Sequence, residues 1–124
     1  MKIEMTDKTP EVELCTKSYA YSIKGESFPE NVKDFYAPVL EYIERDLKTS
    51  CGNTINLNLQ LIYFNSSTAR ILCTLLEMFD DAASNNIVNI NWIYRRNDDN
   101  IEEMGSDFQE IVSTAFFNMV EVNG

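Results

Sequence analysis

Residues 55–68 read INLNLQLIYFNSST, and this stretch decides the fold of the chain. Its first half alternates apolar residues with amides, which is the period-two pattern of a strand with one buried face. Its end, Leu61–Phe64, is apolar at every position. The strand is therefore predicted to be central and covered on both sides. The polar residues after Phe64 predict a helix from about Ser66 to Ala83.

Further strands and helices are predicted on both sides of this stretch. After a turn at 84–86, apolar residues alternate again from Val88 to Tyr94, and the strand–helix–strand order implies a right-handed crossover between parallel strands. Two short strands, around 12–14 and 19–23, precede the breaks at Gly25 and Pro29. The chain ends with a helix over about 99–114 and a short strand over 118–122. Together these elements predict one α/β domain, residues 1–124, with a mixed sheet, a leading hairpin and helices packed on it.

An amphipathic helix is predicted from about Glu30 to Lys48, where apolar residues recur every three or four positions. Pro38 lies inside this pattern. Proline removes a backbone hydrogen bond and crowds the preceding turn. The helix is therefore expected to kink or divide near Ala37.

The composition excludes several classes of function. The 124 residues include 20 acidic and 10 basic ones, for a formal net charge of -10 and no histidine. This charge repels nucleic acids and anionic membranes, so a protein partner is expected instead. The lack of histidine removes every Ser-His or Cys-His catalytic arrangement. No cofactor or metal is expected.

The sequence also indicates where the protein works. No apolar run approaches the roughly 20 residues that cross a bilayer, and the amino-terminal residues are too polar for a signal peptide. We expect a soluble, cytoplasmic protein. Cys15, Cys51 and Cys73 are then expected to be reduced packing residues.

The hydroxyl cluster Ser66-Ser67-Thr68 is the strongest candidate site. One residue, Asn65 or Ser66, suffices as the helix N-cap, and the sequence supplies a surplus. On a helical wheel Ser66 and Ser67 flank a polar stripe, whereas Thr68 lies almost opposite and should face the core. The stripe consists of Arg70, Thr74, Glu77 and Asp81. Phosphorylation here would add about two negative charges beside Arg70 and the positive end of the helix dipole.

Other conspicuous residues have simpler interpretations. Arg95 and Arg96 could bind an anion or hold a phosphorylated segment, or could be a solvated pair that offsets nearby acids. The acidic run 98–103 lacks the ligand spacing of an EF-hand and suits the first turn of a helix. Trp92 and Tyr94 are interpreted as core residues. The helix after Phe64 has a wide apolar surface, which either another helix covers or a partner contacts.

Three segments resemble the SiaC family of bacterial regulatory phosphoproteins: Ser27–Asn31, Leu61–Thr68 and Trp92–Asn97. The resemblance implies a fold like that of STAS domains, the anti-sigma-factor antagonists. It also implies a switch set by a protein kinase and a PP2C-type phosphatase, whose unphosphorylated form binds and activates a diguanylate cyclase. The family's phosphoacceptor follows the asparagine, which makes it Ser66 here. Serine replaces the usual threonine, and Ser67 is the alternative.

Our leading hypothesis is a phosphorylation-controlled interaction module that performs no catalysis itself. Ser66 accepts the phosphate, Asn65 shapes the junction, and Ser67, Arg70 and Thr74 lie on the surface that a partner contacts. One alternative is an anti-sigma-factor antagonist that binds an anti-sigma kinase. A second is a small carboxylate-dependent enzyme that uses Asp80 and Asp81.

Overall fold

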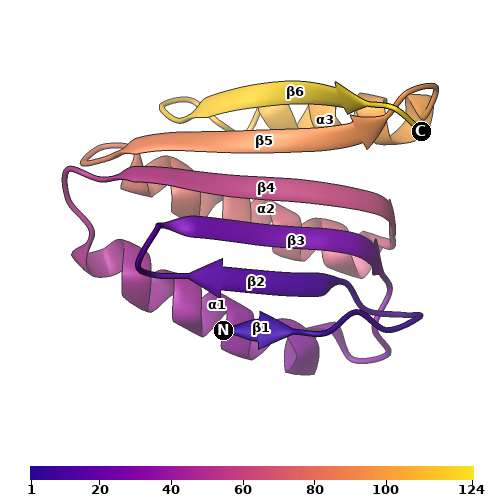
Figure 1. Ribbon diagram of the computed structural model, residues 1–124, viewed down its shortest axis with the longest axis horizontal. Helices are drawn as coiled ribbons and strands as arrows, with labels where there is room; N and C mark the ends of the chain where they lie inside the picture. Colours follow the sequence, from indigo (N-terminus) through magenta and orange to yellow (C-terminus); the bar gives the residue numbers. More distant parts are fainter.

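The computed structural model describes all residues, 1–124, and its central feature is a six-stranded sheet with the strands in sequence order (Figure 1). The first three strands are antiparallel, and each later strand is parallel to its predecessor. The predicted mixed sheet and leading hairpin are confirmed. The strands are β1 (Lys2–Ile3), β2 (Glu11–Cys15), β3 (Ala20–Ser27), β4 (Thr54–Phe64), β5 (Ile87–Arg95) and β6 (Phe116–Val122).

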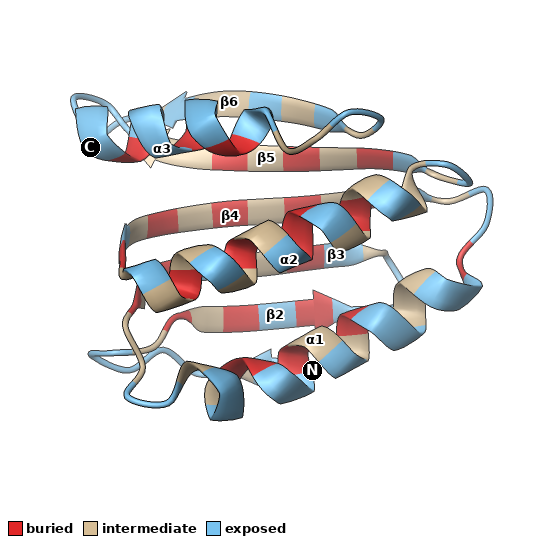
Figure 2. Ribbon diagram, turned by 180° about the vertical axis from the view of Figure 1, so that it is seen from behind, coloured by how far each residue is buried: buried red, intermediate tan, exposed pale blue.

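Three helices connect the parallel strands: α1 (Val32–Thr49), α2 (Ser66–Ala82) and α3 (Asp99–Gln109). All three lie on the same face of the sheet, with α2 between α1 and α3, and their buried residues face the strands (Figure 2). None of them is long and apolar enough to span a bilayer. Because every crossover leaves and re-enters the sheet on one face, the opposite face has no helical cover.

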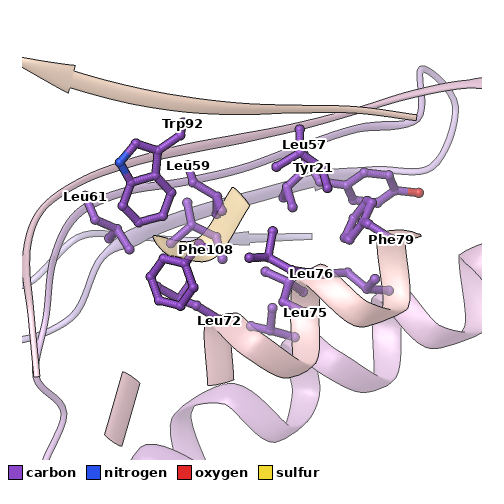
Figure 3. Close-up of a cluster of buried hydrophobic side chains, with 14 of the residues drawn as sticks. Tyr21, Leu57, Leu59, Leu61, Leu72, Leu75, Leu76, Phe79, Trp92 and Phe108 are labelled. Atoms are coloured by element: carbon purple, nitrogen blue, oxygen red, sulfur yellow. The ribbon is translucent and has the colours of Figure 1, made fainter. Parts of the chain in front are cut away.

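The core lies between the sheet and the helices (Figure 3). The inward side chains of β4 pack on the apolar face of α2, and each fully buried leucine contributes about 1.5–3 kcal/mol. Trp92 and Phe108 close one end of this layer, with ring centroids 5.3 Å apart. The indole Nε1 of Trp92 donates to the carbonyl of Ile101 at 2.9 Å. The interpretation of Trp92 as a core residue is confirmed, since it is buried.

Helix α3 reaches this cluster through a glycine. A Cβ atom on Gly105 would lie 2.4 Å from Cδ1 of Trp92. Since the indole is buried and cannot move aside, only glycine allows this close approach. The short α3 is thereby fixed against β5.

The uncovered face of the sheet carries rows of amides. Nδ2 of Asn118 donates to Asn91 at 3.0 Å, and Nδ2 of Asn91 donates to Asn58 at 2.9 Å. In a second row on the same face, Nδ2 of Asn89 donates to Oδ1 of Asn56 at 3.3 Å. These side chains are half-buried or exposed, so the prediction that β4 is covered on both sides is wrong.

A β-bulge explains why the sequence at the end of β4 is apolar at every position. Gly25 pairs with Leu61 and Glu26 with Tyr63, which leaves Ile62 as an extra residue on β4. As a result Tyr63 is 52% exposed although its sequence neighbours are apolar. Gly25 itself has φ +116°, and β3 continues through it to Ser27 instead of ending there as predicted.

One predicted helix break and one predicted helix end also need correction. Helix α1 is continuous through Pro38, because the sheet-facing residues on both sides, Tyr36 and Val39, are fully buried and hold the two halves in line. Helix α3 ends at Gln109, well before the predicted limit at Thr114. The backbone of 113–115 binds Asp80 of α2 instead, which draws these residues out of the helix.

Two smaller expectations concern side-chain exposure. Cys15 and Cys51 are exposed, so their assignment as packing residues is wrong, because they lie on the solvent side of a strand and in a loop. Cys73 is half-buried against the core, as predicted. The wide apolar surface of α2 is partly covered by α1, which packs beside it.

Candidate functional site

The candidate site is the strand–helix junction where β4 ends and α2 begins. Asn65 is the N-cap: its backbone is extended and its Oδ1 accepts the amide of Thr68 at 3.0 Å. Its carbonyl accepts the amide of Ala69 at 3.0 Å, which starts the helical ladder. Asn65 thereby satisfies the capping requirement that the sequence left open between Asn65 and Ser66.

Capping by Asn65 leaves two hydroxyls uncommitted. Ser66 is exposed and Ser67 is half-buried. Neither side chain takes part in a hydrogen bond within the chain, whereas the hydroxyls of Thr68, Ser27 and Tyr36 all do. The predicted surface position is confirmed for Ser66, and Ser67 is partly accessible. Their oxygens are therefore free to react with, or to bind, another molecule.

Thr68 faces the opposite way, as the helical wheel predicted. It is fully buried, and its hydroxyl donates to the carbonyl of Ser27 at 3.1 Å. The hydroxyl of Ser27 lies 2.9 Å from that of Thr68 and 2.6 Å from the phenol of Tyr36. Thr68, Ser27 and Tyr36, which we call the buried hydroxyl network, join the first turn of α2 to the end of β3 and to α1.

The electrostatic surroundings of the junction differ from those of the other helix starts. The first turn of α1 contains Asp34, and that of α3 contains Asp99 and Glu102. The first turn of α2 contains no acidic residue, in a chain whose net charge is -10. The positive end of the α2 dipole is thus not offset by a carboxylate in that turn.

The other two predicted surface residues lie on the same stripe of α2 as Ser66. Arg70 and Thr74 follow it at four-residue intervals and are both exposed. The hydroxyl of Thr74 donates to the carbonyl of Arg70 at 3.3 Å, so it is partly satisfied by its own helix. Arg70 forms no ion pair in the chain. The structure therefore brings Ser66, Arg70 and Thr74 onto one surface.

The arginine pair at the end of β5 lies elsewhere. Arg95 lines a hollow of about 420 Å³ on the uncovered face of the sheet, together with Lys24 and Gln60. That face is opposite the helices, so the hollow that Arg95 lines lies on the other side of the sheet from α2. Arg96 donates its amide to the carbonyl of Val122 at 2.8 Å, and neither arginine forms an ion pair with an acid.

Of the two carboxylates of the enzymatic alternative, Asp80 has a structural role. Asp80 accepts the amides of Thr114 and Ala115, each at 2.8 Å, as well as the amide and hydroxyl of Ser113. Partial burial raises the pKa of Asp80, but these donors outweigh burial and hold the pKa below its ordinary value of 3.8. Asp81 is exposed and belongs to no group of three or more residues that could hold a metal ion.

The acidic run before α3 serves as a helix start. Asp98 is the N-cap of α3, and its side chain accepts the amide of Ile101 at 3.2 Å. The phenol of Tyr94 donates to Glu102 at 3.3 Å, and desolvation of the phenol together with the charge of Glu102 raises the pKa of Tyr94. These contacts account for the run without a ligand.

Two parts of the site, Ser27 and Tyr36, were not predicted from the sequence. Tyr36 looked like one more apolar residue of an amphipathic helix, and Ser27 like a loop residue. One signal was available: a threonine that faces the core must find a hydrogen-bond partner there. The prediction for Thr68 therefore already required such a partner.

The fold and the site define a small α/β domain with helices on one face of a mixed sheet and an exposed serine, free of hydrogen bonds within the chain, at the start of its central helix. The model of the SiaC family of regulatory phosphoproteins matches residues 3–122. The chain belongs to the SiaC family.

Relatives with known structures share this architecture. SiaC of Pseudomonas aeruginosa in its complex with the diguanylate cyclase SiaD, which it activates, superposes with a TM-score of 0.91 at 25% identity, over 98% of this chain and 99% of that one. Apo-SiaC from the same organism superposes with a TM-score of 0.85 at 24% identity, over 97% of both chains. The uncharacterized protein PA14_02130 of Pseudomonas aeruginosa strain UCBPP-PA14 is 26% identical over 117 residues, 94% of this chain and 92% of that protein.

Proposed function

We propose that this chain is a phosphorylation-controlled activator of a diguanylate cyclase. In the unphosphorylated form it binds the cyclase through the exposed stripe at the start of α2. A protein kinase places a phosphate on Ser66 and a PP2C-type phosphatase removes it. The chain contributes a binding surface to the reaction and no catalytic group.

The similarity to SiaC in its cyclase complex carries this proposal. It extends over 98% of this chain, and the relative in that structure is described as an activator of the cyclase. The family is one of regulatory phosphoproteins, which supports control by phosphate. The uncommitted, exposed hydroxyl of Ser66 supports the choice of acceptor.

The position of Ser66 explains how a phosphate would act as a switch. The dianion would lie beside Arg70 and at the positive end of the α2 dipole, so the free domain tolerates it. A docked partner would remove water from that same group. Desolvation of an unpaired dianion costs several kcal/mol, which lowers the affinity by orders of magnitude.

Affinity measurements with the diguanylate cyclase of the same organism test the proposal. Ser66→Ala is expected to bind and activate the cyclase like the wild type, and Ser66→Asp is expected to lose most binding. Ser106→Ala is the matched control, because Ser106 is another exposed helical serine, located on α3. Equal affinity of Ser66→Ala and Ser66→Asp would contradict a switch at this residue.

The same measurement distinguishes the anti-sigma alternative. An antagonist of that kind would bind an anti-sigma kinase and leave cyclase turnover unchanged. Incubation of the wild type with its kinase and ATP should abolish cyclase activation, and addition of the phosphatase should restore it. Activation that persists in fully phosphorylated protein would contradict the proposed direction of the switch.

A further inference from the structure

We propose that the buried hydroxyl network of Thr68, Ser27 and Tyr36 positions the first turn of α2 so that Ser66 is presented to the enzyme that phosphorylates it. This inference rests on the proposed function and extends it to residues that no kinase could touch. Thr68, Ser27 and Tyr36 are all fully buried. They are positioning residues, since they act through the backbone of the turn that carries Ser66.

The carbonyl oxygen of Ser27 binds the first turn of α2 through two hydrogen bonds. It accepts the amide of Asn65 at 3.2 Å and the hydroxyl of Thr68 at 3.1 Å. These two donors flank Ser66 and Ser67 in the sequence, so both ends of the serine pair are tied to one atom at the end of β3. The amide of Thr68 also donates to Oδ1 of Asn65 at 3.0 Å, which closes the turn.

Tyr36 extends the anchor to α1. Its phenol lies 2.6 Å from the hydroxyl of Ser27, which links the beginning of α1 to the beginning of α2. This part of α1 lacks one backbone hydrogen bond, because Pro38 has no amide hydrogen to donate to the carbonyl of Asp34. The tyrosine hydroxyl therefore holds a segment whose own helical ladder is incomplete.

The network is more polar than packing alone requires. Valine, alanine and phenylalanine would fill nearly the same volumes without buried polar atoms, which are costly unless every one is paired. Here every buried side-chain polar atom has a partner. Burial raises the pKa of Tyr36 to about 12, so the phenol keeps its proton near neutrality. The hydroxyls additionally fix the orientation of the first turn of α2, because hydrogen bonds are directional and apolar contacts are not.

A second buried tyrosine provides a matched control. Tyr21 is 1% exposed, and its hydroxyl donates to Oδ2 of Asp46 at 2.9 Å. It lies near the opposite end of the sheet from the start of α2, where β3 begins. Tyr21→Phe and Tyr36→Phe each remove one buried phenol hydroxyl, and only the second removal touches the network.

The experiment compares four variants: Thr68→Val, Thr68→Ser, Tyr36→Phe and Tyr21→Phe. The first readout is the exchange rate of the amides of Ala69 and Arg70. The second is the initial rate at which phosphate appears on Ser66 of purified protein in an extract of its native cells with ATP, measured by peptide mass spectrometry. Thr68→Val and Tyr36→Phe should speed amide exchange about tenfold, as expected for one lost hydrogen bond. They should slow phosphorylation by roughly ten- to a hundredfold, as misplacement of a reacting group does.

Thr68→Ser keeps a hydroxyl and should restore both rates to within about threefold of the wild type, and Tyr21→Phe should leave both unchanged. If Thr68→Val is phosphorylated as fast as the wild type, the positioning role is wrong while the proposed function stands. If Tyr21→Phe slows phosphorylation as much as Tyr36→Phe, the effect is general destabilisation and the inference is also overturned. If the wild type itself gains no phosphate on Ser66, the proposed function fails and the inference fails with it.

Discussion

At the carboxyl-terminal end of α2, the carboxylate of Asp80 accepts hydrogen bonds from three consecutive residues, Ser113 to Ala115. At the amino-terminal end of the same helix, the hydroxyls of Ser66 and Ser67 have no partner within the chain. Both ends looked reactive in the sequence. The difference teaches that a polar residue is a candidate for function when folding leaves it uncommitted, and that an engaged carboxylate holds a loop.

The comparison predicts that changes at the two ends of α2 affect different properties. Ser66→Asp should lower the affinity for the cyclase at least about a hundredfold, because the charge is desolvated in the complex. Its melting temperature should stay close to that of the wild type, since the side chain is exposed. Calorimetric titration and thermal unfolding of one sample check both statements. A large drop in melting temperature with unchanged affinity would show that Ser66 contributes to stability and not to binding.

Asp80→Ala should have the opposite profile. The three amides of 113–115 lose their acceptor, which should cost about 2 kcal/mol of unfolding free energy, because hydrogen bonds to charged groups are stronger than neutral ones. Urea unfolding measures this loss. Affinity for the cyclase should change little. If cyclase activation depended on Asp80 more than on Ser66, a chemical role for the Asp80 carboxylate would have to be reconsidered.

The folded-state pKa of Asp80 predicts a pH dependence. Because this pKa is held below 3.8, the stabilisation is fully present above that pH and is lost as the pH falls through the lowered folded value. Between about pH 6 and about pH 3, the melting temperature of the wild type should fall more than that of Asp80→Asn, whose amide does not titrate. Parallel curves for the two proteins would show that another group dominates the acid response.

Removal of the N-cap should have a moderate effect. Asn65→Ala loses the acceptor for the amide of Thr68 and should destabilise the protein by about 1 kcal/mol. Asn65→Asp keeps a capping oxygen and is the control. Chemical denaturation separates them, and an alanine variant as stable as the aspartate variant would mean that the network beneath the turn suffices without a cap.

Ser67→Ala should change least. Its hydroxyl makes no hydrogen bond, so the free energy of unfolding should stay within about 0.5 kcal/mol of the wild type. Its phosphorylation is the sharper readout: phosphate on the Ser67→Ala variant should remain at the wild-type level, because the proposed acceptor is Ser66. Loss of the modification in this variant alone would transfer the site to Ser67.

Much of the fold could be predicted because periodicity reports which residues share a face. The alternation in 55–61 and the polar residues after Phe64 identified β4 and the start of α2 to within a residue. The alternation in 55–61 indicated one buried face, but the apolar run at 61–64 led to the prediction of cover on both sides, so the open amide face was missed. Alternation does not reveal a bulge, and Ile62 and Tyr63 therefore looked like evidence for a second buried face.

The site was predictable to the extent that it is local. Positions along one helix determined that Ser66 and Ser67 are accessible and Thr68 is not. The partners of Thr68 could not be identified this way, because Ser27 lies 41 residues away and is brought close only by the β3–β4 pairing. The two-residue strand β1 and the limit of α3 likewise depend on long-range contacts that a local pattern does not contain.

Peptide mapping of the protein isolated from its native cells, before and after treatment with a PP2C-type phosphatase, tests the central claim most directly. We expect one phosphate, attached to Ser66, that the phosphatase removes. A phosphate confined to a residue outside the start of α2, or a chain that stays unmodified in every growth condition, would contradict the account.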